Sequence, residues 1–208
     1  MINVMHNYLT KKIKPNYPFY KFLILNTSSY SYEIVDILKD VIGEAEVIGC
    51  EGLNVIFYFN SVDVDFKNLI KTINDDFSIE AHLFESGKVY FNDGSEYQSI
   101  IDLYKQANLN KYIYSSNRNL LNYLINKDKR SASIYAPILL NKMIIDESLM
   151  MLVRSMFDCD LNISKTSQNI YMHRNTVNYK LEQIKDETGL DIRKFKDAVI
   201  MYEFMKII

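Results

Sequence analysis

The chain has 208 residues, of which 48% are hydrophobic and 24% are charged, the composition of a globular protein with one large or two small domains. Its formal net charge of −2 excludes a nucleic-acid binder of the histone kind, because strong non-specific binding needs a large basic excess. No apolar run has the length of a signal sequence or of a membrane helix, so we expect a cytoplasmic protein without a membrane partner.

The first half of the chain alternates between strand and helix patterns. Residues 1–18 contain Pro15 and Pro18 and are predicted to form an irregular or short helical extension. Period-two and buried-strand patterns predict strands at 20–25, 46–50, 54–59 and 79–84, and helical spacing predicts helices at 32–41 and 66–77. This order is the split βαβ arrangement of ferredoxin-like domains, in which both helices lie on one face of an antiparallel sheet.

A charged segment without apolar residues, 126–131, marks the predicted domain boundary. Before it, residues 87–94 are predicted to form a loop or an extra hairpin, followed by helices at 97–107 and 117–127. We therefore predict an α+β protein with an α/β domain at 1–116, a linker helix at 117–132 and an all-α domain at 133–208. We assign the α/β domain a regulatory or dimerisation role.

The C-terminal domain is predicted to begin with helices at 135–145 and 147–157 and to close with a helix at 191–206. Six apolar residues recur at helical spacing in the closing helix and are predicted to be its buried stripe. They are Ile192, Phe195, Val199, Tyr202, Met205 and Ile208.

Two helices joined by a tight turn are predicted between 162 and 189. Asn162 is a good N-cap for the first helix, and His173 is suited to cap a second helix that Gly189 ends. The second helix should run from Arg174 to Thr188. One narrow apolar stripe on it must be buried against the rest of the domain, and it consists of Val177, Leu181 and Ile184.

The opposite face of this second helix carries side chains that suit DNA. Arg174, Asn175 and Asn178 are the candidate base readers, because Arg forks to guanine and Asn to adenine in the major groove. Four further residues are candidates for contacts to the DNA backbone, namely Thr176, Tyr179, Lys180 and Lys185. His173 has two interpretations, a phosphate contact or a cap without a role at the DNA.

The segment from His173 to Leu181 spells H-R-N-T-V-x-Y-K-L and resembles the DNA-binding segment of the PucR/CdaR family of bacterial transcription regulators. The order of elements from 146 to 208 resembles that family's C-terminal domain. Two residues depart from the family's pattern. Lys180 stands where Arg is usual and loses the guanidinium fork. Ser167 stands where Ala is usual at the helix crossing, and its hydroxyl is expected to bond back to the preceding turn without disturbing the crossing.

The predicted α/β domain resembles, by topology alone, the degenerate nucleotide-cyclase-like domain that precedes this helix-turn-helix in the family. Cyclases of that fold carry G-G-D/E-E-F at the turn between the central strands. This chain has Glu51, Gly52, Leu53 and Asn54 there, so the acidic metal ligands are missing. The three histidines are scattered and no metal-ligand spacing occurs, so we expect no catalytic residue, metal or cofactor.

The leading hypothesis is a sequence-specific transcription regulator that binds double-stranded DNA as a homodimer or higher oligomer, with two recognition helices in successive major grooves. The alternative is a protein-interaction module in which the helix pair docks on another protein and the α/β domain dimerises. Residues 131–208 contain ten Lys and Arg and ten Asp and Glu, and this neutrality favours the alternative. No pattern identifies a small-molecule effector.

Overall fold

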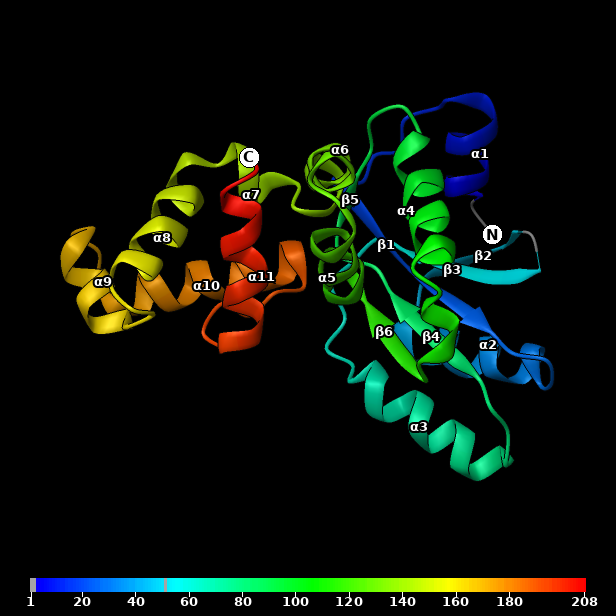
Figure 1. Ribbon diagram of the computed structural model, residues 1–208. Coiled ribbons are helices and arrows are strands. Elements are labelled where there is room, and N and C mark those ends of the chain that lie inside the picture. Colours follow the sequence, from blue (N-terminus) through cyan, green and yellow to red (C-terminus); the bar gives the residue numbers. More distant parts are fainter. Residues whose placement is uncertain (1–2, 51) are drawn as a thin grey trace. The chain divides into compact units, whose positions relative to one another are not determined.

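The computed structural model describes residues 3–50 and 52–208, which belong to two compact units, 1–116 and 117–208 (Figure 1). The first unit combines a β-sheet with helices, and the second unit is helical. This confirms the predicted fold class. The helix predicted as a linker, α5 (Asn117–Lys127), belongs to the second unit. In the described ranges, no helix is both long and apolar enough to span a membrane.

The strands of the first unit are β1 (Phe19–Asn26), β2 (Ala45–Cys50), β3 (Leu53–Tyr58), β4 (His82–Glu85), β5 (Val89–Tyr90) and β6 (Tyr114–Ser116). The sheet has the order β2-β3-β1-β4-β6, with β5 paired to β1 off this path. β1 is antiparallel to both β3 and β4, and β2 is antiparallel to β3. These pairings confirm the split βαβ arrangement, to which β6 adds a strand parallel to β4.

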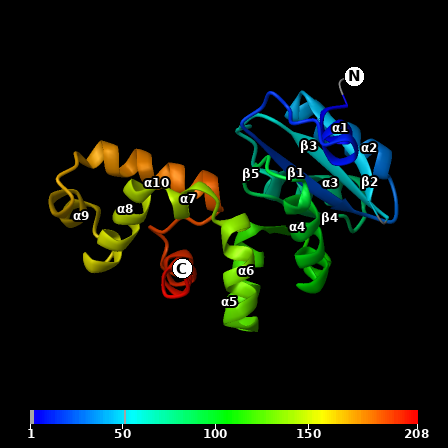
Figure 2. The same cartoon turned by 90° about the horizontal axis from the view of Figure 1, so that it is seen from above.

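The helices of the first unit are α1 (Val4–Lys11), α2 (Ser31–Ile42), α3 (Phe66–Phe77) and α4 (Ser95–Gln106), with a 3-10 turn at Leu109–Lys111. α2 and α3 lie on one side of the sheet and α4 on the other (Figure 2). Leu23 and Leu25 of β1 pack in the core beneath α2 and α3. Phe22 faces α4, where its ring centroid lies 5.6 Å from that of Tyr97. Successive side chains of β1 point to opposite faces of the sheet, so this strand contributes to the hydrophobic core on each face.

The predicted N-terminal extension contains a docked helix, α1. Its first turn is held by the buried carboxylate of Glu46 on β2, which accepts the N–H groups of Met5 at 2.7 Å and His6 at 2.9 Å. An acidic side chain at this end of a helix satisfies unpaired donors and complements the helix dipole. The Tyr8 hydroxyl accepts the N–H of Asn92 at 2.9 Å, which ties α1 to the segment before α4.

Three details of the first unit differ from the prediction. β4 begins at His82 rather than at residue 79. The Asn74 amide donates to the Ala81 carbonyl and accepts the Ala81 N–H, each at 2.9 Å, so these backbone groups are not available for pairing between strands. Residues 89–90 pair with β1 instead of forming a hairpin of their own. β6 was not predicted, because a strand of three residues is too short to show a period.

The second unit contains α5, α6 (Lys129–Leu139), α7 (Lys142–Ile145), α8 (Glu147–Asp158), α9 (Ile163–Asn169), α10 (Arg174–Thr188) and α11 (Phe195–Met205). The single helix predicted at 135–145 is wrong. α6 begins six residues earlier, where Asp128 caps it by accepting the N–H of Ser131 at 2.7 Å. It ends before Asn141, whose left-handed φ of 45° separates α6 from α7.

The predicted stripe of the closing helix is wrong for most of its length. Ile192 is buried, but Phe195 is 76% exposed and Val199 and Tyr202 are also exposed. Ala198, Ile200, Met201 and Phe204 are the residues that α11 buries. α11 carries apolar residues all round, so their period could not identify the face that packs.

Candidate nucleic-acid interface

The two predicted helices form α9 and α10, and capping fixes their ends as the sequence indicated. The Asn162 side chain accepts the N–H groups of Ser164 at 3.0 Å and Lys165 at 3.1 Å. His173 Nδ1 accepts the N–H of Asn175 at 3.2 Å, which leaves Nε2 outside the cap. Gly189 ends α10 with a φ of 76°, a value that a Cβ would strain.

The predicted buried stripe of α10 is confirmed. Val177, Leu181 and Ile184 are all buried in the interior of the second unit, where α10 packs against α7, α8 and α9. Ser167 of α9 is buried too, and its hydroxyl donates to the Ser164 carbonyl at 2.9 Å. The predicted bond to the preceding turn is therefore present. It satisfies the hydroxyl without requiring space at the contact between α9 and α10.

The candidate base readers lie on the exposed surface of α10. Arg174, Asn175 and Asn178 are all exposed, and in the part of the chain that the structure describes no hydrogen bond or ion pair engages their side chains. Thr176 and Tyr179 are exposed on the same helix. Because the buried stripe fixes the rotation of α10, this polar surface is held rigidly outward, and its side chains need no internal bond to be broken before they contact a ligand.

The two candidate lysines differ in their surroundings. Lys180 is partly buried, and its Nζ donates to the Ser148 hydroxyl near the start of α8 at 2.8 Å. Lys185 is exposed and its Nζ lies 3.7 Å from a carboxylate oxygen of Glu182, one turn away on α10. Exposed pairs of this kind contribute little to stability and exchange readily. Lys185 is therefore the more accessible cation.

Lys180 meets a polar cluster that caps α8. Asp146 accepts the Ser148 hydroxyl at 2.6 Å and the N–H groups of Ser148 and Leu149 at 2.9 and 3.2 Å. The Ser148 hydroxyl, these N–H groups and the charge of Lys180 lower the pKa of Asp146 against a smaller opposing effect of burial. The cluster joins the middle of α10 to the start of α8.

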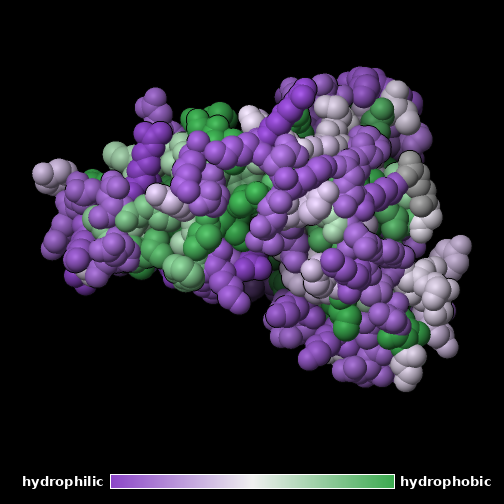
Figure 3. All heavy atoms as spheres, viewed as in Figure 1, coloured by the Kyte–Doolittle hydropathy of each residue, from purple (hydrophilic) through white to green (hydrophobic). Residues whose placement is uncertain are grey.

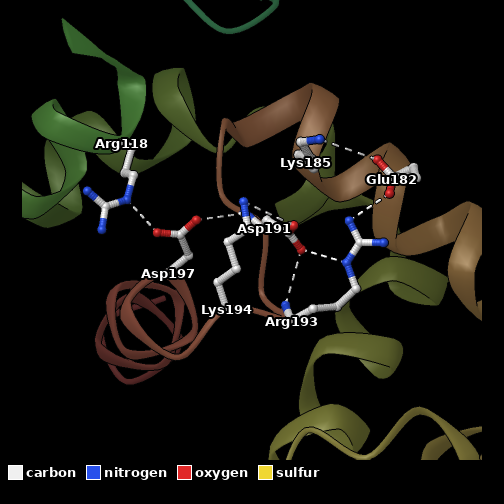
Figure 4. A network of polar contacts seen from close by, with 7 residues as sticks. All are labelled: Arg118, Glu182, Lys185, Asp191, Arg193, Lys194 and Asp197. Carbon is white, nitrogen blue, oxygen red and sulfur yellow. Dashed lines mark hydrogen bonds and ion pairs between the residues drawn. The ribbon is translucent and has the colours of Figure 1, made fainter. Parts of the chain in front are cut away.

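A second polar network holds the segment between α10 and α11 (Figure 4). The Arg193 guanidinium lies 2.6 Å from Oε1 of Glu182 on α10 and 2.6 Å from Oδ1 of Asp191. These two carboxylates raise the pKa of Arg193, with the hydrogen bond to Asp191 as the largest cause. Arg193 is therefore a fixed cation that joins α10 to the turn that follows it.

Asp197 of α11 extends this network to α5. One of its oxygens pairs with Nε of Arg118, and the other accepts the N–H of Asp191 at 3.1 Å. Asp197 is buried, whereas the Arg118 side chain is 38% exposed. Sequence reasoning missed these residues, because D-x-R after Gly189 is the only local signal and it does not reveal partners on α5 and α10.

Acid should weaken the second unit through Asp191. Burial, the largest influence, raises its pKa, but the hydrogen bonds and charge of Arg193 and the charge of Lys194 together bring the pKa below its ordinary value of 3.8. A lowered folded pKa gives stability that is complete above the unfolded value and is lost as pH falls through the folded one. We expect the melting temperature to drop below pH 3.8, and to drop less in Asp191→Asn. Circular dichroism between neutral pH and that range measures this, and equal drops would contradict it.

No group of three or more His, Cys, Asp or Glu side chains within residues 3–50 and 52–208 has an arrangement that could hold a metal ion. The candidate site is the exposed face of α10, which presents hydrogen-bond donors and acceptors on a rigidly packed helix.

Comparison with known proteins places a family domain on this part of the chain. Residues 149–203 match the PucR C-terminal helix-turn-helix domain. The uncharacterized protein YsfB of Bacillus subtilis (strain 168) is 33% identical over 63 residues, which are 30% of this chain and 17% of that protein. The carbohydrate diacid regulator of Escherichia coli (strain K12) is 38% identical over 42 residues, 20% of this chain and 11% of that protein.

The chain therefore spans less than a fifth of the length of these curated relatives. A crystal structure of the regulator of polyketide synthase expression from Bifidobacterium adolescentis aligns with 91% of this chain and 80% of that one, at 14% identity and a TM-score of 0.39. The second unit contains a PucR C-terminal helix-turn-helix domain.

Proposed function

We propose that this protein is a sequence-specific DNA-binding transcription regulator that inserts the start of α10 into the major groove and acts as a dimer. The observation that carries the proposal is the first turn of α10, whose polar side chains are exposed on a capped, rigidly packed helix. The PucR-type domain over residues 149–203 supports the same function. Two copies are required because neutral domains bind weakly one at a time, and half-sites about 34 Å apart suit a two-fold dimer.

Arg174, Asn175 and Asn178 are the proposed base readers. They lie in the first two turns of α10, the part of a recognition helix that approaches base edges. Arg donates two hydrogen bonds to guanine, and Asn both donates to and accepts from adenine.

The proposed contacts to the DNA backbone are made by His173, Thr176, Tyr179 and Lys185. His173 can play both predicted roles at once. Its Nδ1 accepts the N–H of Asn175 as the helix cap, and its Nε2 is left to donate to a phosphate. Such contacts fix register without reading sequence.

We propose a different role for Lys180, for which its contacts in the second unit are the support. Its bond to Ser148 makes it a positioning residue that holds the angle between α10 and α8, in addition to any attraction it exerts on phosphates. Lys185→Met should lower the dependence of log affinity on log salt by about 1, as expected for one lost phosphate contact.

Lys180→Met should leave this slope nearly unchanged and lower the melting temperature instead. Gel-shift titrations across a salt series and circular dichroism measure the two effects in matched variants. A loss of slope in Lys180→Met without a loss of stability would contradict the positioning role.

Selection of bound sites from random duplexes, followed by footprinting, tests the function itself. The expected result is a two-fold symmetric sequence protected over two successive major grooves. Failure to bind any duplex near physiological salt would reject the proposal. It would favour the alternative, a module that docks a partner protein, which the ten cations and ten anions of residues 131–208 also permit.

We further propose a regulatory rather than a catalytic role for the first unit. Of the hairpin residues that replace the acidic cyclase turn, Glu51 lies outside the described residues, and Leu53 and Asn54 lie in β3. Leu53 offers no metal ligand, and Asn54 offers a neutral amide where the cyclases carry carboxylates that bind the metal ions of phosphoryl transfer. Turnover of nucleoside triphosphates with added magnesium would contradict this assignment.

A further inference from the structure

A groove on the second unit is lined by residues of α7, α8 and the end of α9 with the turn that follows it. It has a volume of about 690 Å³, and its walls include Ile144, Met150, Met151, Arg154, Ile170 and Tyr171. Figure 3 shows hydrophobic residues at the surface of this unit, where Figure 1 draws α8 and α11. Exposed apolar surface rimmed by charges is typical of sites that contact other proteins.

Tyr171 forms the edge of this groove in a strained conformation. It follows α9 with a left-handed φ of 52°, and Met172 then donates its N–H back to the Ser167 carbonyl at 2.9 Å, the helix ending in which glycine is usual. Its side chain is 96% exposed. Tyr171 therefore has a backbone conformation that favours glycine, and its ring is surrounded by water. Neither feature stabilises the fold, which indicates that the ring has another function.

The outer surface of α8 is complementary to itself. Glu147 and Arg154 are exposed two turns apart, with Met150 and Met151 between them. Among the residues that the structure describes, neither charged side chain has a hydrogen bond or an ion pair. When two such helices cross antiparallel about the middle of this stretch, each Glu147 meets the Arg154 of the other copy and the methionines meet at the centre. Parallel helices would oppose like charges instead.

We propose that this groove is the contact between two copies of the protein, with α8 packed antiparallel about a two-fold axis and Tyr171 covering its rim. The choice of a second copy rests on the proposed function, which needs two recognition helices. The lining of the groove comes from α7, α8 and the segment around the end of α9, and it includes no residue of α10. The residues proposed to read DNA therefore lie outside the proposed contact.

Charge reversal tests this pairing in the full chain without DNA. In sedimentation experiments at about 1 to 100 µM, wild type should dimerise, and Glu147→Arg and Arg154→Glu should each weaken the dimer about 100-fold. Each variant alone opposes like charges twice. An equimolar mixture of the two variants restores both ion pairs and should form a heterodimer. Lys196→Glu, an exposed charge reversal on α11, is the matched control and should dimerise like wild type.

Tyr171→Gly provides a test that does not depend on charge. It relaxes the left-handed residue and removes the ring, so the melting temperature should stay within about 2 °C of wild type or rise. The dimer should weaken at least about tenfold, whereas Tyr171→Phe should keep it. A wild type that stays monomeric at these concentrations would overturn the proposal, and so would normal dimerisation of Glu147→Arg, Arg154→Glu or Tyr171→Gly.

A mixture that fails to restore the dimer would also overturn the antiparallel arrangement. Because these measurements use no DNA, they separate this proposal from the proposed function. A dimer lost in Arg154→Glu and recovered in the mixture supports the interface even if no duplex is bound. If the protein binds DNA specifically but Glu147→Arg, Arg154→Glu and Tyr171→Gly dimerise as tightly as wild type, the proposed function is supported and the proposed interface is overturned.

Discussion

Arg174→Ala is expected to weaken binding to the selected DNA site by ~1 to 3 kcal/mol and to relax sequence preference at one base pair of each half-site. The guanidinium is exposed at the first position of α10, and no described residue engages it. Its removal therefore costs contacts to the DNA and leaves the fold unchanged. Gel-shift titration on the selected site and on single-base variants of that site measures both effects.

Arg130→Ala is the matched control for this prediction. It removes the same charge from an exposed position of α6, so it should lower affinity only through the small change in overall electrostatics. Asn175→Ala should relax preference at a different base pair. Unchanged affinity and sequence preference in Arg174→Ala would refute the assignment of this residue to base reading.

Leu181→Ala is expected to lower the free energy of unfolding of the second unit by about 2 to 5 kcal/mol. The side chain is 1% exposed and lies where α10 meets the other helices of the unit. Truncation removes apolar contacts and leaves a cavity that rigid helices cannot fill. Urea unfolding followed by far-UV circular dichroism measures the loss, and DNA binding should fall with the folded fraction.

Tyr179→Ala serves as the stability control on the same helix. Its side chain is 73% exposed, so its loss should change the unfolding free energy by no more than about 0.5 kcal/mol. The pair of variants distinguishes the inner and outer faces of α10. Equal destabilisation by both would mean that α10 does not pack through its Leu181 face.

The parts of the structure that the sequence predicted well are those that neighbouring residues decide. Asn162, His173 and Gly189 act on backbone groups within four residues of themselves, and the bounds of α10 follow from them. The apolar stripe of α10 is narrow, so its period identifies the buried face. α3 was likewise predicted with its observed bounds, Phe66–Phe77.

The parts that could not be predicted depend on distant partners. The start of β4 is set by Asn74, whose amide replaces the ladder bonds of Ala81. The packed face of α11 carries Asp197, whose partner Arg118 lies on α5, and apolar residues occur all round this helix, so its own sequence does not identify that face. At the candidate interface, the sequence identified the exposed polar residues, but the bond of Lys180 to Ser148 spans 32 residues and leaves no local pattern.

The contact between Glu46 and α1 bears on how the α/β unit can be shortened. A protein trimmed to begin after Lys12 would keep every strand, but it would remove the two backbone N–H donors that the Glu46 carboxylate accepts. Trimming would also uncover Phe91, whose ring the Tyr8 ring meets edge-on at 4.9 Å. The leading residues are thus a structural part of the unit, and a minimal version of it has to retain them.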